Sequence, residues 1–312
     1  MESPNPKIKF YKARTLSETF TVTFEYLREN WKPLLLFSFY LILPICLIQA
    51  FSMNAYLRLA FSMGYESAAG TIDGFIFSFI RDSVILTIIT LIGNSVLYSM
   101  VYSLMTAYER RDNRLMEIKL EDCKQSLIRN AVKMLQVSLF LIGISILIAG
   151  FIGLLAWIAI ETLFVTLPVL VIGCIAVWIP LNLFMPIYIF EDISFFEAFQ
   201  KSFKYGFSSW GETFVLILVF GLLANIISGV TMLPWYIVVM FGEIFSLTEP
   251  DSALNASIWY QFISYLLGIV QAFGTYVSII LGTVAIAFQY FHIREKLEGV
   301  SFDASIQNFE QL

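Results

Sequence analysis

The stretch that decides the fold runs from Ile189 to Phe214 and reads IFEDISFFEAFQKSFKYGFSSWGETF. Polar and aromatic residues recur in it at helical spacing, and a long apolar segment follows directly. This combination is typical of an amphipathic helix that lies in the membrane interface and leads into a membrane span. The chain contains two further segments of this kind, so we predict an internal repeat.

The first copy lies near the N-terminus, and a weaker copy lies between the outer two. The outer copies share a glutamate, two phenylalanines and a tryptophan in the same order. The middle copy keeps the glutamate and has a leucine in place of the second phenylalanine. The residues of this interfacial-helix motif are Glu18, Phe20, Phe24 and Trp31, then Glu121 and Leu127, and finally Glu197, Phe199, Phe203 and Trp210.

Composition assigns the chain to the membrane proteins. Of its residues 58% are hydrophobic and only 14% are charged, and 30 are phenylalanine. One soluble core cannot bury that much apolar surface. We therefore expect an integral membrane protein.

Six apolar segments are long enough to cross a bilayer. The predicted fold is an all-α polytopic membrane protein, with six transmembrane helices and three cytoplasmic interfacial amphipathic helices in three repeats of interfacial helix plus helical hairpin. Pro168, Pro180 and Pro186 should kink or break the fourth span. The expected spans are 31–51, 84–108, 135–158, 163–190, 212–240 and 259–290, and residues 52–81 are expected to form an external loop with partial helix.

The distribution of basic residues predicts the orientation. Of the 19 Lys and Arg residues, all but Arg58 and Arg81 fall on one side of this arrangement. By the positive-inside rule that side is cytoplasmic, so both termini are cytoplasmic. The expected parts are a cytoplasmic tail (1–14), a single six-span membrane domain (15–291, with repeats of about 15–108, 119–190 and 192–291) and a cytoplasmic C-terminal tail (292–312).

Two runs carry a resemblance to a known family. YIFEDISFFEAFQKSFKYG has an acidic pair after a Pro-broken span, and then E-A-x-x-x-S before another span. It resembles bacterial six-span proteins grouped with the glycerophosphoryl diester phosphodiesterase membrane domain. The run FQYFHIREKLEGVSFDASI also looks like the ends of such proteins. The resemblance implies a bacterial cytoplasmic (inner) membrane protein without the catalytic domain that sometimes accompanies this family, and so implies no activity.

An enzyme would need converging catalytic groups. The best candidates are Glu191 and Asp192, but adjacent helical residues do not face each other. Alternatively, Asp192 or Ser194 supplies the N-cap oxygen of the next helix, and Glu197 completes a capping box with Ser194. The single His292 excludes the usual histidine-based metal sites. We therefore expect no enzymatic activity, no metal and no cofactor.

The repeated residues have two interpretations each. Glu18, Glu121 and Glu197 either favour the helix macrodipole in a first turn or share a functional role around a central site. The repeated phenylalanines either anchor the helices in the membrane or line a ligand site. Basic residues form short juxtamembrane clusters that suit anionic lipid headgroups, so we expect no nucleic-acid partner.

Four amides lie inside the expected spans, at Asn94, Asn182, Asn225 and Gln271. An amide in hydrocarbon must find a partner, so this intramembrane polar cluster could join helices. It could instead line a polar pocket beside the broken fourth span, as in transporters.

These patterns favour a non-enzymatic integral membrane protein that organises or senses the bilayer or scaffolds a membrane complex. The alternative is a carrier or channel for a lipid or an amphipathic small solute, which would use the four amides. Membrane lipids are the expected partners, and a protein partner or a homo-oligomer fits the first function.

Overall fold

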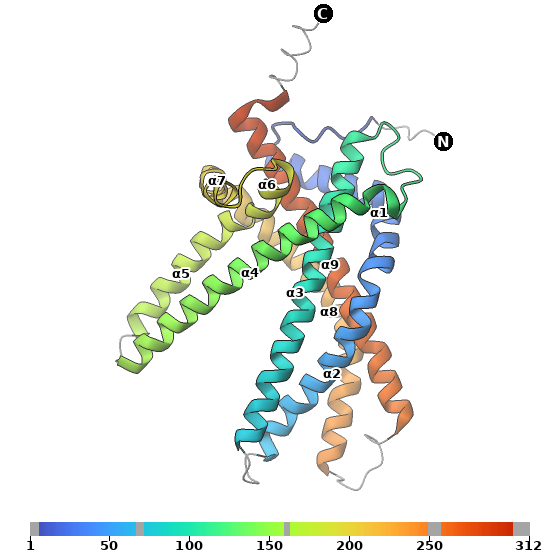
Figure 1. Ribbon diagram of the computed structural model, residues 1–312, viewed down its shortest axis with the longest axis vertical. Coiled ribbons are helices and arrows are strands. Elements are labelled where there is room, and N and C mark those ends of the chain that lie inside the picture. Colours follow the sequence, from blue (N-terminus) through green and yellow to red (C-terminus); the bar gives the residue numbers. More distant parts are fainter. Residues whose placement is uncertain (1–5, 67–71, 159–162, 249–256, 302–312) are drawn as a thin grey trace, which may run out of the picture. The chain divides into compact units, whose positions relative to one another are not determined.

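The computed structural model describes residues 6–66, 72–158, 163–248 and 257–301 (Figure 1). These residues form helices and contain no strand. Five helices are long and apolar enough to cross a membrane, or up to six if the bent pair α1 and α2 forms one span, which agrees with a multi-pass membrane protein. The helices are α1 (Leu16–Leu41), α2 (Leu43–Glu66), α3 (Ile72–Arg110), α4 (Leu120–Ile158), α5 (Leu163–Leu181), α6 (Phe184–Phe190), α7 (Phe195–Ser208), α8 (Trp210–Thr248) and α9 (Ile258–Glu298).

The chain divides into two compact units. The first unit contains α4 to α7 together with one end each of α1, α3, α8 and α9. The second unit contains α2 and the remainder of those four helices. Among the described residues the first unit comprises 6–34, 98–158, 163–221 and 281–301, and the second comprises 35–66, 72–97, 222–248 and 257–280.

Polar side chains and small residues join the helices of the second unit. The Tyr276 hydroxyl donates to Gln49 Oε1 at 2.7 Å, and the Trp235 indole N–H donates to Asn54 Oδ1 at 2.9 Å. A Cβ at Gly93 would lie 2.0 Å from the Tyr276 hydroxyl oxygen, so only glycine allows this approach. Close contact at small residues and interhelical hydrogen bonds are the usual means of joining helices in lipid.

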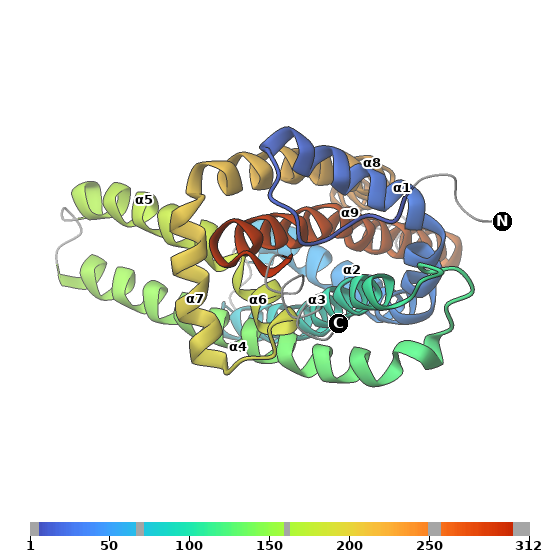
Figure 2. The same ribbon diagram turned by 90° about the horizontal axis from the view of Figure 1, so that it is seen from above.

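In the first unit, α7 lies crosswise to α5 (Figures 1 and 2). Pro180 has no N–H, so the carbonyl of Ala176 lacks its usual intrahelical donor. The indole N–H of Trp210 donates to that carbonyl at 3.1 Å. Gly206 lies against Pro180 so closely that an added Cβ would be 2.4 Å from the proline Cα. Pro180, near the end of α5, therefore also provides the surface on which α7 packs.

Aromatic rings fill the remaining space below α7. The Phe199 ring packs edge-on against Phe140 of α4, with 5.3 Å between centroids, and against Phe184 of α6, with 5.7 Å. Phe195 makes similar contacts with both rings. Phe199 and Phe203, whose rings are 5.1 Å apart, are half-buried. Phe199 thus packs against neighbouring helices in the first unit, whereas the ring of Phe203 contacts Phe199 and Phe207 of its own helix.

The predicted breaks in the fourth span are confirmed in part. The helix is interrupted at residues 182–183, between α5 and α6, with Pro180 on one side and Pro186 on the other. Pro168 lies inside α5 without interrupting it. Pro168 is the sixth residue of α5, so it removes one backbone hydrogen bond, the one to the carbonyl of Phe164, without ending the helix.

The prediction of one continuous first span at 31–51 was wrong. The helix breaks at Ile42, and α1 and α2 are bent by 56°. Pro44 explains the break, because it cannot donate to a preceding carbonyl and it disfavours helical geometry at the residue before it. Residues 52–66 of the expected external loop continue α2, and α3 already begins at Ile72. Residues 67–71 of that loop, and residues 159–162 and 249–256 between later expected spans, lie outside the described residues.

Other helix ends also differ from the prediction. The middle copy of the interfacial helix and the third span form one uninterrupted helix, α4. The first copy is separated from its span only by Asn30, whose φ and ψ of −112° and 16° are not helical. The last helix runs beyond the expected end at 290, through Glu298.

Gly206→Ala should lower the free energy of unfolding by about 1–3 kcal/mol, the usual cost of forcing a methyl group into a packed contact. SDS titration in mixed micelles, followed by tryptophan fluorescence, measures this change. Gly211→Ala is the matched control, since an added Cβ there meets nothing within 4 Å. Equal stability of the two variants would contradict the close packing of α7 against Pro180.

Candidate functional site

The outer two copies of the motif each begin with a hydroxyl side chain that caps the helix. The backbone N–H of Thr15 donates to Glu18 Oε2 at 2.7 Å, and the N–H of Glu18 donates to Thr15 Oγ1 at 3.3 Å. Ser194 caps α7 in the same way, accepting from the N–H of Glu197 at 3.4 Å. The predicted N-cap is confirmed, and Ser194 rather than Asp192 supplies it. The capping box is confirmed only in part, because Glu197 Oε2 accepts from the Ser194 hydroxyl at 3.5 Å and not from its backbone N–H.

The middle copy begins one residue out of the expected register. The N–H of Lys119 donates to Asp122 Oδ2 at 3.1 Å, so Asp122 takes the place that Glu18 and Glu197 hold in the outer copies. Glu121 lies one position earlier and is exposed. The two acids are adjacent in the sequence, and only the hydrogen bond distinguishes them.

With Asp122 as the reference, the same positions are buried in all three copies. Leu127 then corresponds to Thr23 and Ser202, and Ile128 takes the place of the second phenylalanine. Each segment therefore turns one equivalent face toward the protein. The buried sets are Thr19, Thr23 and Tyr26; Cys123, Leu127 and Asn130; and Ala198, Ser202 and Tyr205.

The opposite faces carry exposed apolar and basic side chains. On α7, Phe196 and Phe207 are 69% and 56% exposed, and Lys204 is exposed beside them. Phe24 and Ile128 are exposed at equivalent positions of α1 and α4, although Phe24 also touches the ring of Phe220. The exposed bases of these segments are Arg28 on α1, Lys124 and Arg129 on α4, and Lys204 on α7.

The two motif tryptophans differ in their contacts and exposure. Trp210 donates to α5, as described above, whereas Trp31 is exposed and has the Lys32 ammonium 5.7 Å from its ring centroid. Phe20 is half-buried and stacks on Phe220 with 5.3 Å between centroids. The motif therefore serves partly for packing and partly for the exposed faces.

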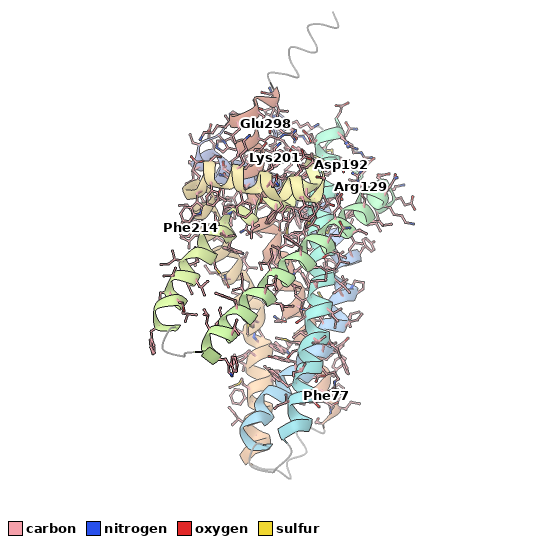
Figure 3. The ribbon with its side chains drawn as sticks, turned by 60° about the vertical axis from the view of Figure 1, so that its left-hand side comes forward. Phe77, Arg129, Asp192, Lys201, Phe214 and Glu298 are labelled. Carbon is pink, nitrogen blue, oxygen red and sulfur yellow. The ribbon has the colours of Figure 1, made fainter. Side chains whose placement is uncertain are left out.

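An ion-pair cluster around one buried carboxylate, which no sequence pattern indicated, holds α7 to α9. Lys201 Nζ lies 2.5 Å from Glu191 Oε2 and 2.6 Å from Glu298 Oε1 (Figure 3). Arg294 Nε lies 3.7 Å from Glu191 and 3.1 Å from Glu298. The Glu191 side chain is only 4% exposed. Two cations and two carboxylates thus neutralise one another at the end of α6.

Three tyrosines complete this cluster. Tyr205 donates to Glu298 at 2.5 Å, and Tyr290 donates to Glu191 at 3.2 Å. Arg294 donates to the hydroxyl of Tyr11 at 3.2 Å. Burial raises the pKa of Tyr205, and the hydrogen bond to Glu298 raises this pKa further. Burial also raises the pKa of Tyr11. Both hydroxyls therefore stay protonated, and that of Tyr205 donates to Glu298 whereas that of Tyr11 accepts from Arg294.

The described part of the expected N-terminal tail packs against the first unit. The Phe10 ring lies 5.6 Å from the Tyr108 ring and 5.0 Å from the Phe291 ring. The backbone N–H of Arg14 donates to His292 Nδ1 at 2.9 Å. The pKa of Arg14 is lowered by its burial. Residues 6–14 form a fixed strap on the helices rather than a free tail.

Asp192 points away from Glu191 to a different cation. Lys133 Nζ lies 2.5 Å from Asp192 Oδ1, and this hydrogen bond lowers the pKa of the Asp192 carboxyl. Asp192 has a φ of 51°, in the left-handed region, as the chain turns from α6 toward α7. The adjacent acids therefore ion-pair separately, which supports their interpretation as structural residues.

The four intramembrane amides belong to different units. Asn182 is in the first unit, and its side chain donates to the carbonyl of Trp178 at 2.7 Å. Asn94, Asn225 and Gln271 are in the second unit. Gln271 Nε2 donates to Thr275 Oγ1 at 3.3 Å, on its own helix. The Oδ1 atom of Asn94 is buried and has no hydrogen-bond partner among the described residues.

Comparisons of the chain with protein-family models, with curated proteins and with solved structures find no match. The resemblance to the phosphodiesterase membrane-domain proteins stays a prediction from the sequence.

Lys201→Met should lower the free energy of unfolding by about 3 kcal/mol, because the buried Glu191 carboxylate would keep only the more distant Arg294 as its cation. SDS titration in mixed micelles measures the loss. Lys204→Met removes the same charge from the same helix at an exposed position and should change stability by less than about 0.5 kcal/mol. Equal effects of the two substitutions would refute the role of Lys201 in holding α7 to Glu191 and Glu298.

Proposed function

We propose that this chain is a non-enzymatic integral membrane protein of a bacterial cytoplasmic membrane, and that it organises or senses the bilayer through amphipathic segments at the cytoplasmic interface. One observation carries the proposal: α7 exposes Phe196 and Phe207 on one side while the ion-pair cluster fixes its other side. Exposed aromatic residues on a fixed amphipathic helix are what insertion into the headgroup region requires.

The geometry of α7 fits this role in detail. Successive helical residues turn by about 100°, so Phe196, Phe203 and Phe207 project in nearly the same direction. Ser208 lies more than about 90° away from that direction and is exposed, on the side that would face water. Lys204 lies between the two sides, where a long basic side chain can reach lipid phosphates.

The recurrence of capping and burial in the first and middle segments supports the same role for α1 and the start of α4. Both segments turn an equivalent face inward and leave an apolar residue, Phe24 or Ile128, outside. The bias of Lys and Arg toward one side of the chain supports a cytoplasmic position for all three segments. Separate ion pairs of Glu191 and Asp192 support the absence of enzymatic activity.

The depth of α7 in a bilayer tests the proposal. In a Cys174→Ser background, spin labels at Phe196→Cys and Phe207→Cys should be more accessible to oxygen than to a water-soluble nickel chelate in lipid nanodiscs. A label at Ser208→Cys, on the same helix, should show the opposite preference. If all three labels are equally accessible to the nickel chelate, α7 lies in water and the proposal fails.

A second candidate function is the carrier for a lipid or amphipathic solute. The observation in its favour is the buried Oδ1 atom of Asn94, which has no hydrogen-bond partner among the described residues and is free to accept one from a ligand.

Native mass spectrometry of the protein released from lipid particles tests this second function. A carrier should retain a specific ligand that Asn94→Leu no longer retains. Gly229→Ala is a fold control in the same unit as Asn94, since a Cβ there meets nothing within 4 Å. If wild type and Asn94→Leu retain the same ligands, the carrier function is ruled out.

A further inference from the structure

Two lysines of α7 lie three positions apart and have opposite surroundings. Lys201 is held between Glu191 and Glu298, and its side chain is 22% exposed. Lys204 is exposed, and no carboxylate of the described residues lies within ion-pair distance of it. The charge of Lys201 is therefore neutralised inside the protein, whereas that of Lys204 is available to a partner.

An exposed base recurs at the position of Lys204 in the middle segment. Arg129 follows Asp122 at the same distance along the chain as Lys204 follows Glu197, so the two bases occupy equivalent places after the capping acids. Figure 3 shows Arg129 on α4 at the same end of the first unit as Lys201. The first segment has Glu25 at this position and carries its exposed base, Arg28, nearly one turn later.

Each of these bases lies beside exposed apolar side chains. Lys204 lies about 60° around the helix from Phe207, and Arg129 follows directly after Ile128. A cation at the edge of an apolar stripe matches the boundary in a membrane where phosphate groups meet acyl chains. An acidic protein surface would also match the cations, but it would not match the exposed Phe196 and Phe207 on the same helix.

We propose that Lys204 and Arg129 bind the phosphate groups of anionic phospholipids, so that the chain collects these lipids around α7 and the start of α4. This inference rests on the proposed function, since both segments must lie at the interface, and it names the lipid class. Juxtamembrane bases each favour an anionic surface by about fivefold in binding. Zwitterionic lipids lack the net charge that would attract these bases.

Spin-labelled lipids measure the preference directly. The full chain is reconstituted in phosphatidylcholine vesicles with a trace of spin-labelled phosphatidylglycerol or spin-labelled phosphatidylcholine, and the motionally restricted fraction of each is compared. Wild type should restrict more phosphatidylglycerol, and added salt should weaken this preference. Lys204→Gln and Arg129→Gln should each lower the ratio of the two restricted fractions by up to about fivefold.

The control is Lys296→Gln, which removes the same charge from an exposed position of α9. It should leave the ratio unchanged. A wild type without preference for phosphatidylglycerol would overturn the inference, as would a preference that survives in the Lys204→Gln/Arg129→Gln double variant. An equal loss in Lys296→Gln would also overturn it, because net charge alone would then be responsible.

This outcome is separable from that of the depth measurement. If the labels at Phe196 and Phe207 lie in lipid but the protein has no preference for phosphatidylglycerol, the proposed function stands and this inference fails. If the labels lie in water but the protein prefers phosphatidylglycerol in a way that depends on Lys204, the proposed function fails instead.

Discussion

The ion pairs of Lys201 and Arg294 with Glu191 and Glu298 join α6, α7 and α9. Glu191 ends α6, Lys201 lies on α7, and Arg294 and Glu298 lie on α9. A carboxylate that is 4% exposed is costly to desolvate unless cations and hydrogen-bond donors surround it. The three helices must therefore keep their positions for the cluster to stay neutral, and this constraint fixes which side of α7 faces outward.

Pro180 imposes a second constraint on the same helix. The carbonyl that it leaves without a donor would be costly in hydrocarbon, and the Trp210 indole removes that cost. Gly206 then allows α7 to lie directly on the proline. A residue that interrupts one helix thus determines where the next one lies, and the aromatic residues that remain exposed on α7 follow from this placement.

Local features of this fold could be predicted from the sequence, and long-range ones could not. The cap at Ser194 and the break near Pro180 depend on residues a few positions apart, which a pattern can identify. Pro44 gave an equally local signal for the break at Ile42, but the apolar composition around it suggested an unbroken span. The pairing of Glu191 with Arg294 joins residues from distant parts of the chain, and no periodicity indicates it.

The middle segment illustrates the same limit in a different way. Glu121 and Asp122 are both plausible first-turn acids, and a choice between them shifts every equivalent position by one residue. With Glu121 as the reference, Leu127 matches an exposed or half-buried phenylalanine; with Asp122, it matches buried Thr23 and Ser202, as its own burial requires. Only this second register places Arg129 at the position of Lys204. The recurrence of an exposed base therefore becomes visible only after the capping hydrogen bond has identified the start of the helix, which is why composition alone indicated lipid contact without indicating which bases make it.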